Sequence, residues 1–316
     1  MKPCRSQGSC TGYSNRSGDG LPAQVLNAFT VDIEDYYHVS AFEKHVRRDE
    51  WGDWESRVTT NTHRLLKLLD RHNVKGTFFV VGWIAQRYPR LVREVHACGH
   101  EIASHGYWHR LIYELSPQDF RHELRRSREV LEDATGARIT AHRAPSFSIT
   151  NRSLWALEVL VEEGFSLDSS IFPIRHDRYG IPRAEPRLHR LTTPAGELWE
   201  FPPSVARMAR VNVPVCGGGY FRLFPLAWTL YCLDHINRRE REPFIFYVHP
   251  WEIDPDQPRI PAGSRLSRFR HYVGLKRTEG KLDRLLARFR FGRVSDVIAA
   301  RAAEAENACA LVNQVP

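Results

Sequence analysis

The feature that most limits the fold of this chain is a sustained alternation of short apolar runs with amphipathic segments. The alternation extends from residue 25 to about residue 250. Short apolar runs are typical of buried strands, and their alternation with helices predicts parallel strands joined by crossover helices. We therefore expect an α/β fold. The expected strands cover residues 25–31, 76–81, 101–104, 139–142, 165–168, 198–201 and 244–248.

Capping residues and glycines mark the helices between these strands. Ser116-Pro117 begins a long charged segment that Thr135-Gly136 closes, which is the usual order of helix start and stop signals. After residue 250 the pattern changes, and two amphipathic helices are expected at 275–290 and 295–312. We predict three parts: a disordered tail at 1–24, one catalytic domain at 25–255, and a helical extension at 256–316 that packs on it.

Charge and cysteine content limit the environment of the protein. Lys and Arg number 45 against 37 Asp and Glu, but the cations are scattered among acids, so the net charge of +8 does not indicate nucleic-acid binding. Six cysteines occur without a CxxC pair, which fits free thiols in a reducing compartment. No apolar segment indicates a signal peptide or a membrane span, so the expected location is the cytoplasm.

Polar side chains follow the predicted strands where each strand ends. The carboxyl ends of parallel strands in an α/β barrel meet on the face where active sites are built. We therefore expect one site formed by residues from five strand ends, namely Asp32, His105, Arg143, Asp168 and His249.

Two sequence features within this set predict a divalent metal site. His105 and His109 are four residues apart, so on a helical turn both imidazoles face one side. The acidic ligand is Glu34 or Asp35: alternation in an extended segment puts residue 34 on the same face as Asp32, and Asp35 is the alternative. A zinc-protease HExxH motif is excluded because a serine, residue 104, stands where its second histidine is needed.

Four ordered motifs resemble those of the polysaccharide deacetylases, the carbohydrate esterase family with a NodB-homology domain. They are Asp32-Ile33-Glu34-Asp35, Ser104-His105-Gly106-Tyr107-Trp108-His109, Arg143-Ala144-Pro145 and Tyr247-Val248-His249-Pro250. The first departs from the family's usual pair of adjacent aspartates. The resemblance implies a distorted (β/α) barrel with a helical C-terminal extension. A narrower similarity, to deacetylases encoded with exosortase-type exopolysaccharide clusters, rests on the Asp-x-Glu-Asp-Tyr-Tyr opening and on residues 216–222.

The same resemblance implies a role for each site residue. Asp32 is the expected base, Arg143 the arginine that pairs with it, His249 the acid, and Asp168 the carboxylate that tunes His249. Two histidines and one acidic residue hold the metal, expected to be Zn²⁺, with Co²⁺, Ni²⁺ or Mn²⁺ as alternatives. The expected substrate-binding residues are Tyr36, Trp108, Pro145, Trp199 and Trp251.

These expectations point to a metal-dependent hydrolase that removes N-acetyl groups from amino sugars of a polysaccharide, such as a bacterial exopolysaccharide, or of its precursor. Two alternatives remain open. One is a deformylase or amidase that uses the same site on a smaller substrate. The other is a catalytically inactive carbohydrate-binding module, against which the presence of both an acid and a base counts.

Overall fold

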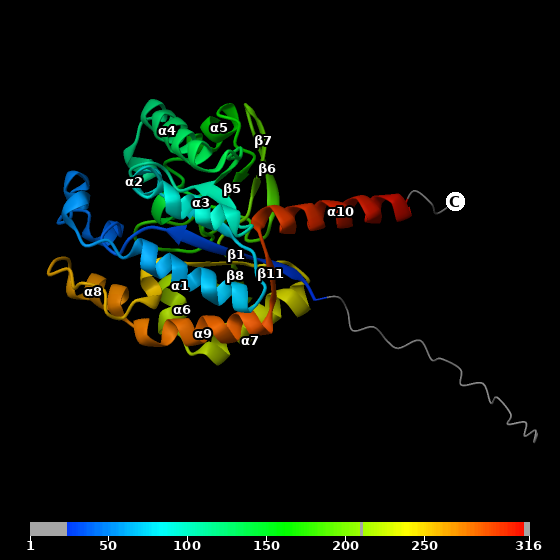
Figure 1. Ribbon diagram of the computed structural model, residues 1–316. Coiled ribbons are helices and arrows are strands. Elements are labelled where there is room, and N and C mark those ends of the chain that lie inside the picture. Colours follow the sequence, from blue (N-terminus) through cyan, green and yellow to red (C-terminus); the bar gives the residue numbers. More distant parts are fainter. Residues whose placement is uncertain (1–23, 209–210, 313–316) are drawn as a thin grey trace, which may run out of the picture.

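The computed structural model describes residues 24–208 and 211–312. The tail predicted to be disordered lies outside the described residues, apart from Gln24. One large sheet organises the rest of the chain (Figure 1). No helix in the described ranges combines the length and apolar character needed to cross a bilayer.

The sheet confirms the predicted α/β class with parallel strands. Neighbouring strands on its main path are parallel except the β6–β7 pair. Within the described ranges no pairing joins the two ends of this path, so the curved sheet is consistent with a distorted barrel that hydrogen bonds do not close. The strands in spatial order are β10 (Ile245–Val248), β1 (Leu26–Ile33), β2 (Thr77–Val80), β3 (Glu101–Ser104), β4 (Ala141–His142), β5 (Leu167–Asp168), β7 (Gly196–Glu200) and β6 (His189–Thr193).

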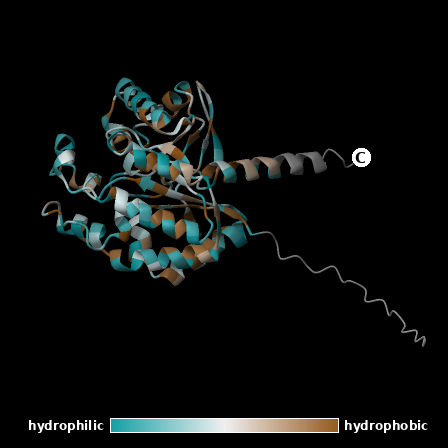
Figure 2. Ribbon diagram, in the orientation of Figure 1, coloured by the Kyte–Doolittle hydropathy of each residue, from teal (hydrophilic) through white to brown (hydrophobic). Residues whose placement is uncertain are grey.

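Helices cover the outside of the sheet, and their ends follow the sequence signals. In α4, the Ser116 side chain accepts a hydrogen bond from the N–H of Asp119, and Gly136 closes the helix in the left-handed region with φ 68°. In Figure 2, α1 and α9 carry hydrophilic and hydrophobic residues side by side, as amphipathic helices do. The helices are α1 (Val58–Arg71), α2 (Gly82–Arg87), α3 (Pro89–Ala97), α4 (Pro117–Thr135), α5 (Trp155–Glu162), α6 (Gly218–Leu223), α7 (Leu226–His235), α8 (Arg265–Tyr272), α9 (Leu275–Arg288) and α10 (Val294–Val312).

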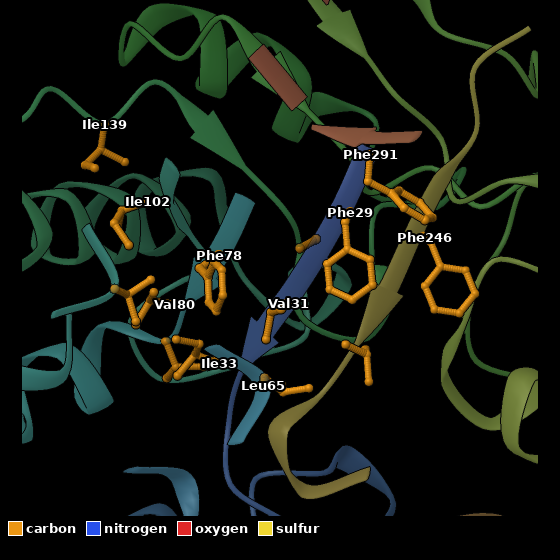
Figure 3. Close-up of a cluster of buried hydrophobic side chains, with 14 of the residues drawn as sticks. Phe29, Val31, Ile33, Leu65, Phe78, Val80, Ile102, Ile139, Phe246 and Phe291 are labelled. Atoms are coloured by element: carbon orange, nitrogen blue, oxygen red, sulfur yellow. The ribbon is translucent and has the colours of Figure 1, made fainter. Parts of the chain in front are cut away.

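Alternation along β1 separates two hydrophobic layers. Phe29, Val31 and Ile33 face the helices and pack with Phe78 and other buried side chains in one large cluster (Figure 3). Residue 28 belongs instead to a cluster on the inner face of the sheet. Complete burial of a Phe or Val side chain contributes about 1.5–3 kcal/mol, so the outer layer fixes the register of β1. The same alternation turns Asp32 toward the inside of the barrel.

Several short strands were not predicted. β11 (Arg290–Gly292) lies between two predicted helices and pairs in parallel with β1, so the chain after residue 255 also contributes to the sheet. Three residues are too few for a periodic pattern. The boundary proposed near residue 255 stays a prediction. The other unpredicted strands are β6 and the two members of a separate hairpin, β8 (Val205–Met208) and β9 (Val211–Pro214).

Candidate metal and catalytic site

The end of β1 sends its three carboxylates into two different environments. Asp32 and Glu34 line a cavity of about 530 Å³ at the carboxyl end of the sheet. Asp35 points elsewhere: it accepts hydrogen bonds from the Ser56 hydroxyl at 2.7 Å and from the N–H of Arg57 at 2.9 Å, next to the start of α1. Burial raises the pKa of Asp35 to about 6. The structure therefore brings Glu34, and not Asp35, to the predicted metal site.

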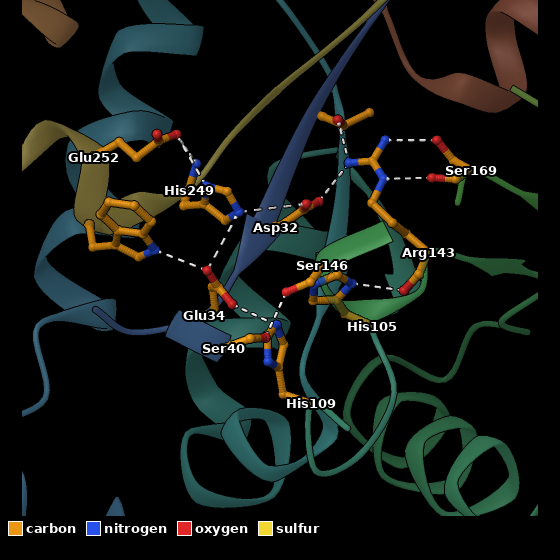
Figure 4. Close-up of polar contacts among 12 residues, drawn as sticks. Asp32, Glu34, Ser40, His105, His109, Arg143, Ser146, Ser169, His249 and Glu252 are labelled. Carbon is orange, nitrogen blue, oxygen red and sulfur yellow. Dashed lines mark hydrogen bonds and ion pairs between the residues drawn. The ribbon is translucent and has the colours of Figure 1, made fainter. Parts of the chain in front are cut away.

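The two histidines come from the loop after β3. This segment is not the helical turn that was expected, because Gly106 and His109 both have left-handed backbone angles, with φ 70° and 50°. The loop nevertheless aims both rings at Glu34. One potential ligand atom from each of His105, His109 and Glu34 lies within 4.8 Å of the others (Figure 4).

The chemistry of these three side chains fits a divalent metal. Nδ1 of His105 donates to the carbonyl of Arg143 at 2.8 Å, which leaves Nε2 with its lone pair. Burial lowers the pKa of His105 to about 3, so its ring is neutral. Nε2 of His109 is buried and makes no hydrogen bond, although it lies 2.7 Å from a Glu34 oxygen. Two electron-pair donors held this close suit a shared cation.

Glu34 itself is ionised and firmly oriented. Burial opposes its ionisation, but His109 and His249 outweigh burial and hold the pKa of Glu34 well below its usual range. One carboxylate oxygen faces His109, and the other accepts a hydrogen bond from the indole N–H of Trp251 at 3.0 Å. Trp251 was predicted as a substrate-binding residue, and it also borders the cavity.

Asp32 is paired with Arg143 inside the barrel. Nη1 of Arg143 lies 2.6 Å from the Asp32 carboxylate and 2.8 Å from the hydroxyl of Thr30. Nη2 donates to the hydroxyl of Ser169 at 2.9 Å. Arg143 is fully buried, so its charge is strongly felt by Asp32. This ion pair, which the resemblance implied, fixes the position of the Asp32 carboxylate.

His249 lies at the end of β10 and faces both carboxylates that enter the cavity. Its Nε2 is 3.9 Å from Asp32 and 3.5 Å from Glu34. Its Nδ1 is 3.2 Å from Glu252, whose other oxygen accepts from Nε of Arg222 at 2.7 Å. Burial lowers the pKa of His249, but Glu34 and Glu252 outweigh burial and raise it to about 9. His249 is therefore a cation at neutral pH.

Glu252 is a site residue that the sequence interpretation missed. It follows His249 by three residues in the short 3₁₀ helix η6 (Pro250–Ile253), where its carboxylate accepts the backbone N–H of His249 at 3.0 Å. The two residues form a capping box in the structure. The usual sequence signature of a capping box begins with Ser, Thr, Asp or Asn, so His249 gave no such signal for Glu252.

The structure does not bring Asp168 to His249. Leu167 belongs to the inner cluster, so alternation turns Asp168 to the outer face of the sheet. There its carboxylate lies 2.9 Å from Nδ1 of His142, the neighbour in β4, and accepts from the hydroxyl of Ser170. The tuning role expected for Asp168 is therefore corrected, and Glu252 occupies the corresponding place.

Four of the five predicted substrate-binding residues do not line the cavity. Tyr36 and Trp108 pack in the aromatic cluster that also contains Trp251. Trp199 on β7 packs against the guanidinium of Arg190 on β6. Pro145 begins a short 3₁₀ helix, η4 (Pro145–Phe147), of which only the next two residues border the cavity. An aromatic side chain near a motif is thus more often part of the core.

Two sequence families match separate stretches of the chain. Residues 50–161 match the family described as polysaccharide deacetylase. Residues 169–299 match a domain of unknown function, DUF3473. The second match includes η6 and α8, so it covers the segment with His249 and much of the cavity rim.

Curated relatives match less than half of the chain. A peptidoglycan-N-acetylglucosamine deacetylase of Bacillus cereus is 32% identical over 98 residues, which cover 31% of this chain and 36% of the relative. The Bacillus subtilis protein YheN, a putative polysaccharide deacetylase, is 30% identical over 136 residues, 41% of this chain and 47% of the relative. The chain thus spans less than half the length of these relatives.

Solved structures share the fold over most of the chain. The crystal structure of a putative polysaccharide deacetylase from Mycobacterium smegmatis aligns with a TM-score of 0.60 at 20% identity, covering 89% of this chain and 91% of the other. A probable polysaccharide deacetylase from Pseudomonas aeruginosa PAO1 aligns with a TM-score of 0.56 at 16% identity, covering 86% and 89%. At these identities the likeness concerns the fold.

Proposed function

We propose, on the premise that this chain belongs to the polysaccharide deacetylase family, that it is a hydrolase that removes N-acetyl groups from amino sugars of a polysaccharide or its precursor. The observation that carries the proposal is the convergence of Glu34, His105 and His109 beside Asp32 and His249. A carbohydrate-binding module needs neither an acid nor a base, so this set favours an enzyme.

The residues that would hold a metal are Glu34, His105 and His109. A divalent metal bound there supplies Lewis acidity, which lowers the pKa of a water and polarises the acetyl carbonyl. We propose Zn²⁺ because two imidazoles and one carboxylate with open positions suit it, and Co²⁺, Ni²⁺ or Mn²⁺ as alternatives. Trp251 orients Glu34, and the carbonyl of Arg143 orients His105, which is how outer contacts tune a metal site.

Asp32 acts first, as the general base. It accepts a proton from the attacking water while the water oxygen forms a bond to the carbonyl carbon of the acetyl group. Arg143, whose Nη1 lies 2.6 Å from the Asp32 carboxylate, holds this base in place.

His249 acts second, as the general acid. It donates the Nε2 proton to the amide nitrogen as the carbon–nitrogen bond breaks, so that the sugar leaves as a neutral amine. The acetyl group leaves as acetic acid, which keeps the second proton of the attacking water and ionises to acetate in solution. Its raised pKa, about 9, keeps this proton available at neutral pH. Glu252 lies beside Nδ1 of His249, whereas Glu34 lies beside Nε2. Glu252 therefore continues to favour the protonated form of His249 when Glu34 binds a metal ion.

The size and opening of the cavity favour a glycan over a small amide. Its volume of about 530 Å³ extends from Asp32 to the exposed side chains of α8. A single acetamide or formamide group fills only the inner end of such a space, whereas an oligosaccharide occupies it. We propose an exopolysaccharide or its precursor as the substrate.

Release of acetate from N-acetylated oligosaccharides tests this function. The protein is loaded with Zn²⁺, and acetate and formate are measured separately over a panel of acetylated and formylated amino sugars. Acetate release that Asp32→Asn abolishes would support the proposal, and formate release alone would favour the deformylase. A chelator should remove activity while the circular dichroism spectrum stays unchanged, because the site lies at the carboxyl end of the sheet and the core does not depend on it. Activity that persists after the metal is stripped would exclude the metal-dependent mechanism.

A further inference from the structure

The outer end of the cavity is bordered by exposed apolar side chains. Leu223 at the end of α6, and Leu266 and Phe269 on α8, have exposed fractions of 52%, 56% and 55%. All three line the same cavity that contains Asp32 at its inner end. We call Leu223, Leu266 and Phe269 the rim. Large apolar side chains that gather at the opening of a cavity indicate an interaction site, whereas single apolar side chains scattered over a surface do not.

The segment that carries the rim on α8 is strongly basic. Residues 257–278 contain no Asp or Glu. Of their cations, Arg265, Arg268 and Arg270 are exposed on the same helix as Leu266 and Phe269. Phe269 and Arg268 also border a second hollow, together with Arg259 and Tyr272. The cations of the segment are Arg259, Arg265, Arg268, Arg270, Lys276 and Arg277.

The segment that follows Leu223 in the sequence also exposes apolar side chains. Residues 223–233 contain no charged side chain, and α7, which begins at Leu226, exposes Trp228 by 37% and Tyr231 by 57%. Trp and Tyr are enriched where a protein meets the boundary between lipid and water. Of the described acids, Asp177 also lines the cavity near this end, and it pairs with Nδ1 of His176 at 2.9 Å.

We propose that the rim docks on an anionic bilayer surface. The exposed residues of α8 are apolar side chains and arginines. The apolar side chains match the acyl boundary of such a surface, and the arginines match its anionic headgroups. The consequence, which rests on the proposed function, is that the reaction centre opens toward glycans held at that surface, such as lipid-linked precursors.

An anionic polysaccharide is the competing occupant, and the apolar side chains argue against it. Sugars stack on flat aromatic faces and bind polar groups. Leu223 and Leu266 offer neither, so a polysaccharide would leave them exposed to water. An acyl boundary removes them from water, which makes the rim favourable only in the lipid case.

Vesicle binding by the full-length chain tests the proposal without any turnover. Phosphatidylglycerol–phosphatidylcholine vesicles should bind the protein at low salt, and pure phosphatidylcholine vesicles should bind it more weakly. The double variant Leu266→Ser/Phe269→Ser should bind about tenfold more weakly or worse, because it loses the apolar contact. Arg265→Gln/Arg268→Gln should weaken binding and flatten its salt dependence. Leu154→Ser is the matched control, since Leu154 is 43% exposed outside the rim and should bind like the parent.

Three results would overturn the proposal. They are no binding to anionic vesicles by the folded parent protein, binding that the rim variant retains in full, and binding to polygalacturonate in place of vesicles. Thermal unfolding of each variant checks that it is folded, and Leu223→Ser provides a second rim variant if the double variant is not. Asp32→Asn should bind vesicles like the parent, so failure of the proposed hydrolase activity and failure of docking give different results.

Discussion

Replacing Trp251 by phenylalanine tests the claim that this indole holds the acidic metal ligand in place. The indole N–H donates to one oxygen of Glu34 at 3.0 Å, while the other oxygen of Glu34 faces His109. Phenylalanine keeps an aromatic ring between His249 and His271, on which Trp251 stacks at centroid distances of 5.2 and 4.3 Å. The substitution therefore removes the hydrogen bond and leaves most of the packing.

The expected effect is a loss of metal affinity. A hydrogen bond to a charged acceptor is worth about 1.5–3 kcal/mol, and each 1.4 kcal/mol changes a dissociation constant about tenfold. The Kd for Zn²⁺ should therefore rise about 10- to 100-fold, in line with other outer contacts of metal ligands. Competition with a fluorescent zinc chelator at fixed pH measures this change directly.

Trp51→Phe is the matched control. Trp51 is as buried as Trp251 and belongs to the same aromatic cluster, but it makes no hydrogen bond to Glu34 among the contacts of the described residues. The Kd of Trp51→Phe for Zn²⁺ should stay within a factor of about two of the parent value, since the metal ligands of this variant keep their hydrogen-bond partners. An unchanged Kd in Trp251→Phe, or an equal rise in both variants, would refute the reasoning, because orientation of Glu34 would then not depend on the indole.

Three further predictions concern the carboxylates and the acid. Glu34→Gln should weaken Zn²⁺ binding at least tenfold, whereas Asp35→Asn should leave it unchanged, because the Asp35 carboxylate is engaged in hydrogen bonds near the start of α1. Metal titration of both variants tests this, and a larger loss of affinity in Asp35→Asn would make Asp35 the ligand. His249→Ala should lower the activity on an N-acetyl sugar at least about 100-fold, but the activity on an acetate ester with a good leaving group much less, since only the amine needs a proton in order to leave. Equal losses of activity on the two substrates would exclude the acid role. Glu252→Gln removes a carboxylate that raises the pKa of His249, so the alkaline limb of the pH–rate profile should move to lower pH, and a shift to higher pH would contradict this sign.

Local sequence patterns were sufficient to predict the strands that carry the site. Each strand in question is an apolar run that ends in a polar residue, and the parallel arrangement forces those ends onto one edge of the sheet. The predicted convergence of Asp32, His105, Arg143 and His249 needed only this rule. The strand β11 escaped prediction because it has only three residues and its partner, β1, lies far away in the chain. The strands β6, β8 and β9 belong to local hairpins, but most of their residues are exposed or half-buried, so they do not form the apolar runs that predict buried strands.

Side-chain direction limited what could be predicted about individual residues. Asp168 ends a strand as predicted, but its neighbour Leu167 fills the inner layer, so the carboxylate points outward to His142. Tyr36 follows the acidic motif directly, yet it packs against Tyr37 and takes no part in the cavity. Position along the chain fixes where a residue is, whereas the packing of its neighbours fixes where its side chain points.

The sequence by itself determined the α/β class, the strands that carry the site and the residue types available for a metal and a base, because these depend on periodicity and on motifs of a few residues. Only the tertiary structure decided between Glu34 and Asp35, since the backbone turn after β1 sends one carboxylate to the histidines and the other to hydrogen bonds near α1. It also brought Trp251 and Glu252 to the site across more than 200 residues of chain, and that proximity follows from the parallel pairing of β1 with β10.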